Sequence, residues 1–150
     1  MNKPIPNPDT LAQVIANTLE ALAPRLQDES LSMIALDCHP WHGSLYLAIL
    51  KQSEVDTDPA LADPEEMADW DLYDCGDGLA QWEAVVPLAE EMGRAYSDAD
   101  DPAPIAEQCL RASAAALTHP AVQNVLKNFR LADGFRLSVA HPDSGQEYVV

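Results

Sequence analysis

Residues 31–50, LSMIALDCHPWHGSLYLAIL, contain two apolar runs separated by a segment rich in His, Pro and Gly. The runs are Leu31–Asp37 and Ser44–Leu50. Two such runs around a turn predict an antiparallel hairpin. Both runs are apolar at successive positions, so both faces of the hairpin need cover. We expect central strands covered on two sides, or covered by helices on one side and by a partner on the other.

A helix is predicted on the N-terminal side of the hairpin. Asn7 or Asp9 can cap it, and Pro8 suits the first helical position. Apolar residues then follow at helical spacing from Leu11 to Leu26. Pro24 interrupts this pattern, so we expect an end or a kink at residue 23. Residues 1–8 are expected to be an extended N-terminal segment.

Three helical patterns follow the hairpin. The first covers 79–96 and contains Pro87, which either kinks one helix or starts the main one. The second starts at Asp101-Pro102, and the third covers 122–129. Asp133-Gly134 is expected to end the third helix.

Further strands are predicted on both sides of these helices. Period-two alternation in 69–73 predicts a half-buried strand, with Trp70 and Leu72 inward and Asp69, Asp71 and Tyr73 outward. Residues 135–140 and 147–150 predict a final hairpin. The order of elements indicates an α+β fold in one domain, 1–150. We expect an antiparallel sheet of about four or five strands packed against several helices.

The charge of the chain is unevenly distributed. The formal net charge is -17, and residues 52–93 contain 13 acidic and no basic side chains. Such a surface repels nucleic acids and anionic membranes, so neither is an expected partner. It attracts a basic protein. The chain shows no secretory signal and no apolar run of membrane-spanning length, and its three cysteines are unclustered, which favours a cytoplasmic protein.

The acidic stretch at 68–82, ADWDLYDCGDGLAQW, raises the question of a metal. Asp69, Asp71, Asp74 and Asp77 could supply oxygen ligands to calcium or magnesium. The calcium-loop template requires an acid at its fifth position, where Tyr73 stands, so that template fails. Solvated acids on a strand and turn explain the stretch as well.

A second candidate is the Cys38-His39-x-x-His42 turn. Thiolate and imidazole are zinc ligands, and Cys75 could be a fourth. A nucleophilic Cys38 activated by His39 or His42 is less favoured, because neighbouring residues in a strand point to opposite faces.

Paired carboxylates are a third candidate for chemistry. Glu83 with Glu90, or Asp37 with Asp74, could work as acid and base if their environments separate the two pKa values. With 25 acids in the chain, such pairs arise easily by chance. Asp37 differs from the others because it lies inside an apolar strand run.

A fourth candidate is a protein-binding surface that combines acids with exposed aromatic side chains. Aromatic residues anchor protein interfaces, and charges steer association. The competing interpretation is that the aromatic residues belong to the core and the acids only solvate the surface. The residues expected to bind the partner are Trp41, Asp69, Asp71, Tyr73, Asp74 and Asp77.

The size, the charge, the hairpin and the W-D-x-Y-D stretch at 70–74 resemble small acidic immunity-type and uncharacterised single-domain proteins of bacterial polymorphic toxin systems. The resemblance implies binding and neutralisation of a basic toxin, without catalysis or cofactor. The alternative is a metal-binding protein or hydrolase that uses Cys38, His39, His42 and the 69–77 cluster. A small-molecule binder with a pocket between sheet and helices is a third hypothesis, and Tyr148-Val-Val150 could form a dimer edge.

Overall fold

The computed structural model describes residues 3–149, and the predicted hairpin lies at its centre. Strand β1 (Ser30–His39) pairs antiparallel with β2 (Ser44–Lys51), in a register that runs from Leu31 opposite Lys51 to His39 opposite Ser44. The short 3-10 helix η2 (Pro40–His42) connects the strands, and Gly43 closes it with a φ of 60°. A left-handed conformation of this kind favours glycine. The predicted hairpin is confirmed.

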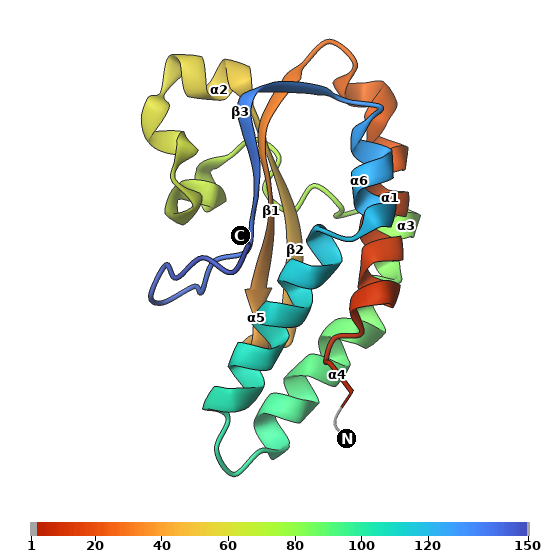
Figure 1. Ribbon diagram of the computed structural model, residues 1–150, viewed down its shortest axis with the longest axis vertical. Coiled ribbons are helices and arrows are strands. Elements are labelled where there is room, and N and C mark those ends of the chain that lie inside the picture. Colours follow the sequence, from red (N-terminus) through yellow and green to blue (C-terminus); the bar gives the residue numbers. More distant parts are fainter. Residues whose placement is uncertain (1–2, 150) are drawn as a thin grey trace.

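The third strand makes the sheet mixed rather than antiparallel. Strand β3 (Arg130–Ser138) pairs parallel with β1, so the strand order is β2-β1-β3. The α+β class is confirmed, but residues 3–149 form three strands in place of the expected four or five. The parallel pairing arises because three helices carry the chain back along one face before it enters the sheet beside β1 (Figure 1).

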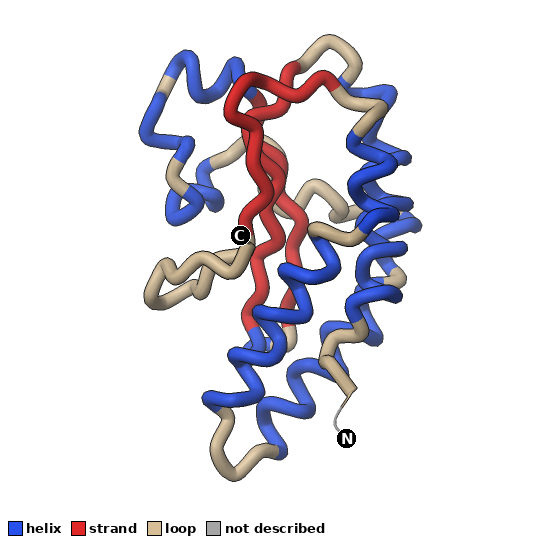
Figure 2. Tube along the Cα trace, viewed as in Figure 1, coloured by secondary structure: helices blue, strands red, loops and turns tan. Residues whose placement is uncertain are grey.

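Two predicted strands, at 69–73 and at 147–150, are not formed as strands within the described residues. In residues 69–73, only Leu72 bridges to a strand, at Ile49; Asp69 ends a 3-10 helix and the remaining residues form a bend and turns (Figure 2). The expected final hairpin forms only in part: residues 135–138 lie in β3, and beyond it Ala140 bridges Glu147, flanked by backbone hydrogen bonds from His141 to Gln146 and from Tyr148 to Val139, both at 2.8 Å, but 147–149 do not form a strand. Val150 lies outside the described residues.

The Asp133-Gly134 pair also has a different role from the one expected. It lies inside β3, where the register with β1 jumps from Leu31–Leu131 to Met33–Arg136. Gly134 has a φ of 78°. The pair therefore makes a bulge within a strand, and the preceding helix already ends at Leu126.

One face of the sheet is covered by helices (Figure 1). Helix α1 packs against α5 and α6, and α5 contacts β1. Their aliphatic side chains form the larger of two buried clusters, together with one face of the hairpin. No helix of the described residues is both long and apolar enough to cross a membrane. The helices of this layer are α1 (Pro8–Leu22), α3 (Ala80–Glu83), α4 (Val85–Asp98), α5 (Ala103–Leu117) and α6 (Pro120–Leu126), with η1 (Ala23–Leu26) after α1.

The observed helix boundaries test the predicted start and end of α1, the predicted extended segment and the predicted role of Pro87. Asn7 caps α1, accepting hydrogen bonds from the backbone N–H groups of residues 9 and 10, and α1 ends one residue before the expected break at 23. The segment before α1 is shorter than the expected 1–8, because Pro8 is already helical. Residues 1–2 lie outside the described part of the chain. Pro87 lies in the first turn of α4, so the main helix starts there and is not kinked.

The other face of the sheet is covered by the acidic segment itself. Helix α2 (Gln52–Thr57) and two 3-10 helices, η3 (Pro59–Ala62) and η4 (Pro64–Asp69), lie across it. Met67 and Trp70 pack there against β1 and β2 in a second buried cluster. The chain thus covers both faces of its central hairpin without a partner. We call residues 52–77 the acidic cover.

Candidate functional site

The acidic cover packs its large apolar side chains on the sheet and exposes most of its carboxylates. Trp70 is only 3 % exposed, and its indole N–H donates to the Leu61 carbonyl at 2.8 Å. Asp69, Asp71 and Asp77 are exposed. The expected inward position of Trp70 and the outward positions of Asp69 and Asp71 are confirmed, although they arise from turns and not from a strand.

One carboxylate fastens the two ends of the cover. Glu54 accepts a hydrogen bond from the Lys51 backbone at 3.0 Å and another from the Asp71 backbone at 2.8 Å. The Lys51 ammonium lies 3.4 Å from the Asp71 carboxylate. This is the single ion pair of the acidic cover within residues 3–149, so most of its negative charge is not neutralised by neighbours.

Asp37, Tyr73 and His39 form a hydrogen-bonded network between the sheet and the cover. Asp37 is 9 % exposed. One of its oxygens accepts from the Tyr73 hydroxyl at 2.7 Å, and the other lies 2.9 Å from His39 Nε2. Tyr73 was expected to point outward. That expectation is wrong, because the turn after Trp70 brings its hydroxyl to a buried carboxylate that needs a donor.

The network shifts the titration of its members. The hydrogen bond to the Asp37 carboxylate raises the pKa of His39 above its usual 6.5, and burial opposes this shift. Burial, followed by the hydrogen bond to Asp37, raises the pKa of Tyr73. Both oxygens of Asp37 are already engaged, and no thiol or hydroxyl nucleophile is bonded to His39 within the described chain. The network therefore suits structural support and pH sensing better than nucleophilic catalysis.

Asp74 and Asp77 lie on the turns that follow Tyr73. Asp74 is half-buried and has a φ of 55°, a conformation that Asp tolerates better than most side chains. Burial, and then the nearby Asp77 carboxylate, raise the pKa of Asp74. Asp37, which was expected to pair with Asp74, bonds the Tyr73 hydroxyl and His39. Glu83 and Glu90, the other expected pair, are both exposed.

Trp41 belongs to a separate aromatic group at the hairpin turn. Its ring centroid lies 5.8 Å from that of His39, 5.8 Å from that of His141 and 6.3 Å from that of Tyr96. It is half-buried. The structure thus joins Trp41 to other aromatic side chains, and among residues 3–149 no hydrogen bond links it to the exposed carboxylates of the cover.

The structure does not bring Cys38 together with the histidines. The Cys38 thiol faces the helical layer, with its sulfur 3.6 Å from that of Met92, while His39 points to the opposite face. Burial raises the pKa of Cys38 to about 12, and burial raises those of Cys75 and Cys109 to about 12 as well. At neutral pH these groups are thiols, which are poor nucleophiles and metal ligands. Within residues 3–149, no three His, Cys, Asp or Glu side chains are arranged to hold a metal ion.

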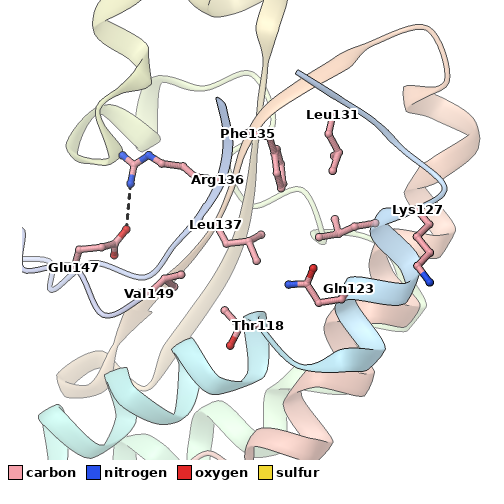
Figure 3. Close-up of a pocket in the computed structure, with 10 residues that line it drawn as sticks. Thr118, Gln123, Lys127, Leu131, Phe135, Arg136, Leu137, Glu147 and Val149 are labelled. Carbon is pink, nitrogen blue, oxygen red and sulfur yellow. Dashed lines mark hydrogen bonds and ion pairs between the residues drawn. The ribbon is translucent and has the colours of Figure 1, made fainter. Parts of the chain in front are cut away.

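A groove lies between β3 and α6 (Figure 3). No single sequence motif predicted it. Its volume is about 720 Å³, and Leu131, one of its lining residues, is 41 % exposed. The lining combines apolar side chains with a few polar ones. It consists of Thr118, Gln123, Leu126, Lys127, Leu131, Phe135, Arg136, Leu137, Glu147 and Val149.

The groove has the opposite charge character to the acidic cover. Lys127 and Arg136 line it, and Arg136 donates to Glu147 at 3.3 Å. The sequence did carry a signal for it, because residues 108–132 contain no acid although the chain is strongly acidic. A sequence pattern could not show that β3 leaves this side open.

Comparisons with known proteins add no relative. No protein-family model matches the chain, and neither a curated protein nor a solved structure is similar to it.

Proposed function

We propose that this protein is a non-enzymatic binding protein whose acidic cover recognises a basic protein, with inhibition or immunity as the sharpest form of that role. The observation that carries the proposal is that the acidic cover packs on the sheet and exposes most of its carboxylates. Met67 and Trp70 pack on the sheet, while most of its carboxylates face solvent and only Asp71 forms an ion pair within residues 3–149. Charges held on a folded support keep their positions when a partner arrives.

The physical mechanism is electrostatic steering followed by docking. A localised negative potential raises the rate at which a basic protein meets the correct face. Asp69 and Asp77 are best placed for this step, because both are exposed and neither forms an ion pair within the described chain. Tyr73 and Trp41 already make contacts inside the protein, so they would contribute to docking only through their remaining exposed edges.

The alternative, a hydrolase or metal protein built on the Cys38 turn, has less support. It requires Cys38 to meet His39 or His42, whereas the thiol lies on the helical side of β1. It also requires a thiolate, and burial holds the pKa of Cys38 near 12.

A capture experiment with charge-reversal variants tests the proposal. The protein is immobilised, exposed to a lysate of its source cells at low salt, and eluted with a salt gradient. Asp69→Lys/Asp77→Lys changes the cover, and Glu20→Lys/Asp133→Lys makes the same charge change at exposed acids elsewhere. We expect the native protein and the control to retain a basic protein that elutes earlier from the cover variant. Equal retention by all three proteins, or a captured protein that is not basic, would contradict the proposal.

A further inference from the structure

A pocket at the hairpin turn lies apart from both the acidic cover and the groove at β3 and α6. Helix η2 contacts α4 and α5 at this end of the sheet. The pocket has a volume of about 490 Å³, within the range of about 300–1,000 Å³ that is common for small-molecule sites. Three rings line it: Trp41 from η2, Tyr96 from α4 and His141 from the segment after β3. It therefore combines the size of a ligand site with an aromatic wall.

The three rings lie close enough together to act on one ligand. The Trp41 centroid lies 6.3 Å from that of Tyr96 and 5.8 Å from that of His141. The planes of these two pairs are inclined by 61° and 39°, so the rings form an angled wall and not a flat stack. A cation within about 6 Å of a ring centroid is attracted by the face of the ring. Centroids at these spacings let one cation come within that distance of more than one ring.

The charged side chains of the pocket favour a positive ligand. Asp101, Glu107 and Asp143 line it, and no Lys or Arg of the described chain does. Glu107 is already paired with Arg111 at 2.7 Å. Asp101 and Asp143 are exposed and form no ion pair within residues 3–149. Two carboxylates therefore remain to balance the charge of a cation, and an anion would be repelled.

The aromatic wall decides which kind of cation fits. A primary ammonium is strongly hydrated and brings three N–H donors that need acceptors, which rings do not supply well. A quaternary ammonium has no N–H donor and presents its charge to ring faces through methyl groups. No three metal-ligating side chains of the described residues are arranged to hold a metal ion. His39, which lies beside Trp41, is balanced when protonated by Asp37 at 2.9 Å, so it opposes a cation little.

We propose that this pocket binds a quaternary ammonium group, whose methyl groups lie against the three rings. Asp101 and Asp143 balance its positive charge. The site uses no residue of the acidic cover, so it does not depend on recognition of a basic protein by that surface. A free trimethylammonium compound and a trimethylated lysine side chain both carry the group.

Calorimetric titration of the full chain at low ionic strength tests the proposal with choline as the probe. We expect choline to bind with a stoichiometry of one. Its uncharged analogue of the same shape, 3,3-dimethylbutan-1-ol, should bind at least about fivefold more weakly, because it lacks the charge that the rings attract. Ethanolamine, which keeps the charge but lacks the methyl groups, should also bind at least about fivefold more weakly. Absence of choline binding, or equal binding of either analogue, would overturn the proposal.

A peptide that carries one trimethyllysine distinguishes the two sources of the group. An affinity above that of choline indicates a modified protein side chain, and an affinity at or below it indicates a free molecule.

Matched variants and chemical-shift mapping locate the site. Asp101→Asn/Asp143→Asn should weaken choline binding at least about fivefold. Asp69→Asn/Asp77→Asn, the same charge change in the acidic cover, should alter it less than about twofold. Trp41→Leu, with its fold checked by circular dichroism, should weaken binding at least about fivefold because a ring is lost. Amide shifts on adding choline should concentrate in 39–43, 94–107 and 140–144. Equal effects of the two double variants, or shifts that lie elsewhere, would also overturn the proposal.

Discussion

The Asp37 side chain joins the sheet to the acidic cover through its hydrogen bond with Tyr73. It was singled out in the sequence because a carboxylate inside an apolar strand run is costly unless it is paired. The structure gives it two partners, the Tyr73 hydroxyl at 2.7 Å and His39 Nε2 at 2.9 Å. The sequence could flag the carboxylate. It could not name these partners, because one of them lies 36 residues away on a turn that has no regular pattern.

Removing the Tyr73 hydroxyl tests this pairing. Tyr73→Phe leaves a buried carboxylate with one donor fewer, so the free energy of unfolding should fall by about 1–3 kcal/mol. Urea denaturation measures it. Tyr46→Phe is the control, because the Tyr46 ring lies 5.8 Å from that of Tyr73 but Asp37 accepts from Tyr73. Equal effects of the two substitutions would show that the hydrogen bond does not stabilise the fold.

The Asp37–His39 pair predicts a pH dependence of stability. The pKa of His39 is raised in the folded protein above its usual 6.5, so folding favours the protonated imidazole. This contribution is fully present below pH 6.5 and is lost as the pH rises through the raised pKa. In His39→Gln, unfolding free energy should therefore change less between pH 6 and about 8. His42→Gln, at an exposed histidine of the same turn, should keep the native profile.

At the scale of elements, two backbones approach closely where the hairpin turn meets α4. A Cβ added at Gly93 would lie 2.9 Å from the Gly43 Cα, and one added at Gly43 would lie 3.1 Å from the Ala89 carbonyl. Neither neighbour is a flexible side chain, so the contact leaves no space for a methyl group. This pair of glycines sets how closely the sheet and the helix pack.

Gly93→Ala tests this contact through the sign of its effect. In an ordinary helix, Gly→Ala stabilises by about 0.5–1 kcal/mol. Here we expect a loss of about 1–3 kcal/mol from overpacking, measured by chemical denaturation. Ser97→Ala, at an exposed position of the same helix, should change stability by less than about 0.5 kcal/mol. A more stable Gly93→Ala variant would refute the close approach.

The acidic cover depends on one large apolar anchor. Trp70 is 3 % exposed and fills the second buried cluster. Trp70→Ala should therefore lower the free energy of unfolding by about 3–5 kcal/mol, measured by denaturant titration. Val86→Ala, at a residue that is 50 % exposed, should have little effect. If Trp70→Ala were equally mild, the cover would not be fixed to the sheet.

Local sequence patterns predicted most of the helices and strands but not how all the strands pair. The hairpin and the start of α1 followed from apolar runs, caps and prolines, which act over a few residues. The alternation at 69–73 was real but did not produce a strand, because the backbone of that segment bridges to β2 only at Leu72. The parallel position of β3 depends on how α4, α5 and α6 return the chain. No local rule contains that information.

Across the molecule, negative and positive side chains are concentrated on different surfaces, the acidic cover and the groove at β3 and α6. The acidic cover lies on the opposite side of the sheet from the helical layer (Figure 1). The groove at β3 and α6 is lined by Lys127 and Arg136 beside apolar side chains. The acidic asymmetry is visible in the sequence, because 13 acids and no bases fall in residues 52–93. The lack of acids in 108–132 hinted at the charge of the groove, but its shape could not be predicted, because an open side of a sheet is a property of the complete topology.

Recognition through the acidic cover is tested most directly by the association rate constant between this protein and the captured basic protein, followed as a function of salt. We expect the rate to fall steeply with rising ionic strength for the native chain and for Glu20→Lys/Asp133→Lys. For Asp69→Lys/Asp77→Lys it should be slower at low salt and its salt dependence shallower. Rates and slopes that coincide for all three proteins would contradict recognition through the acidic cover.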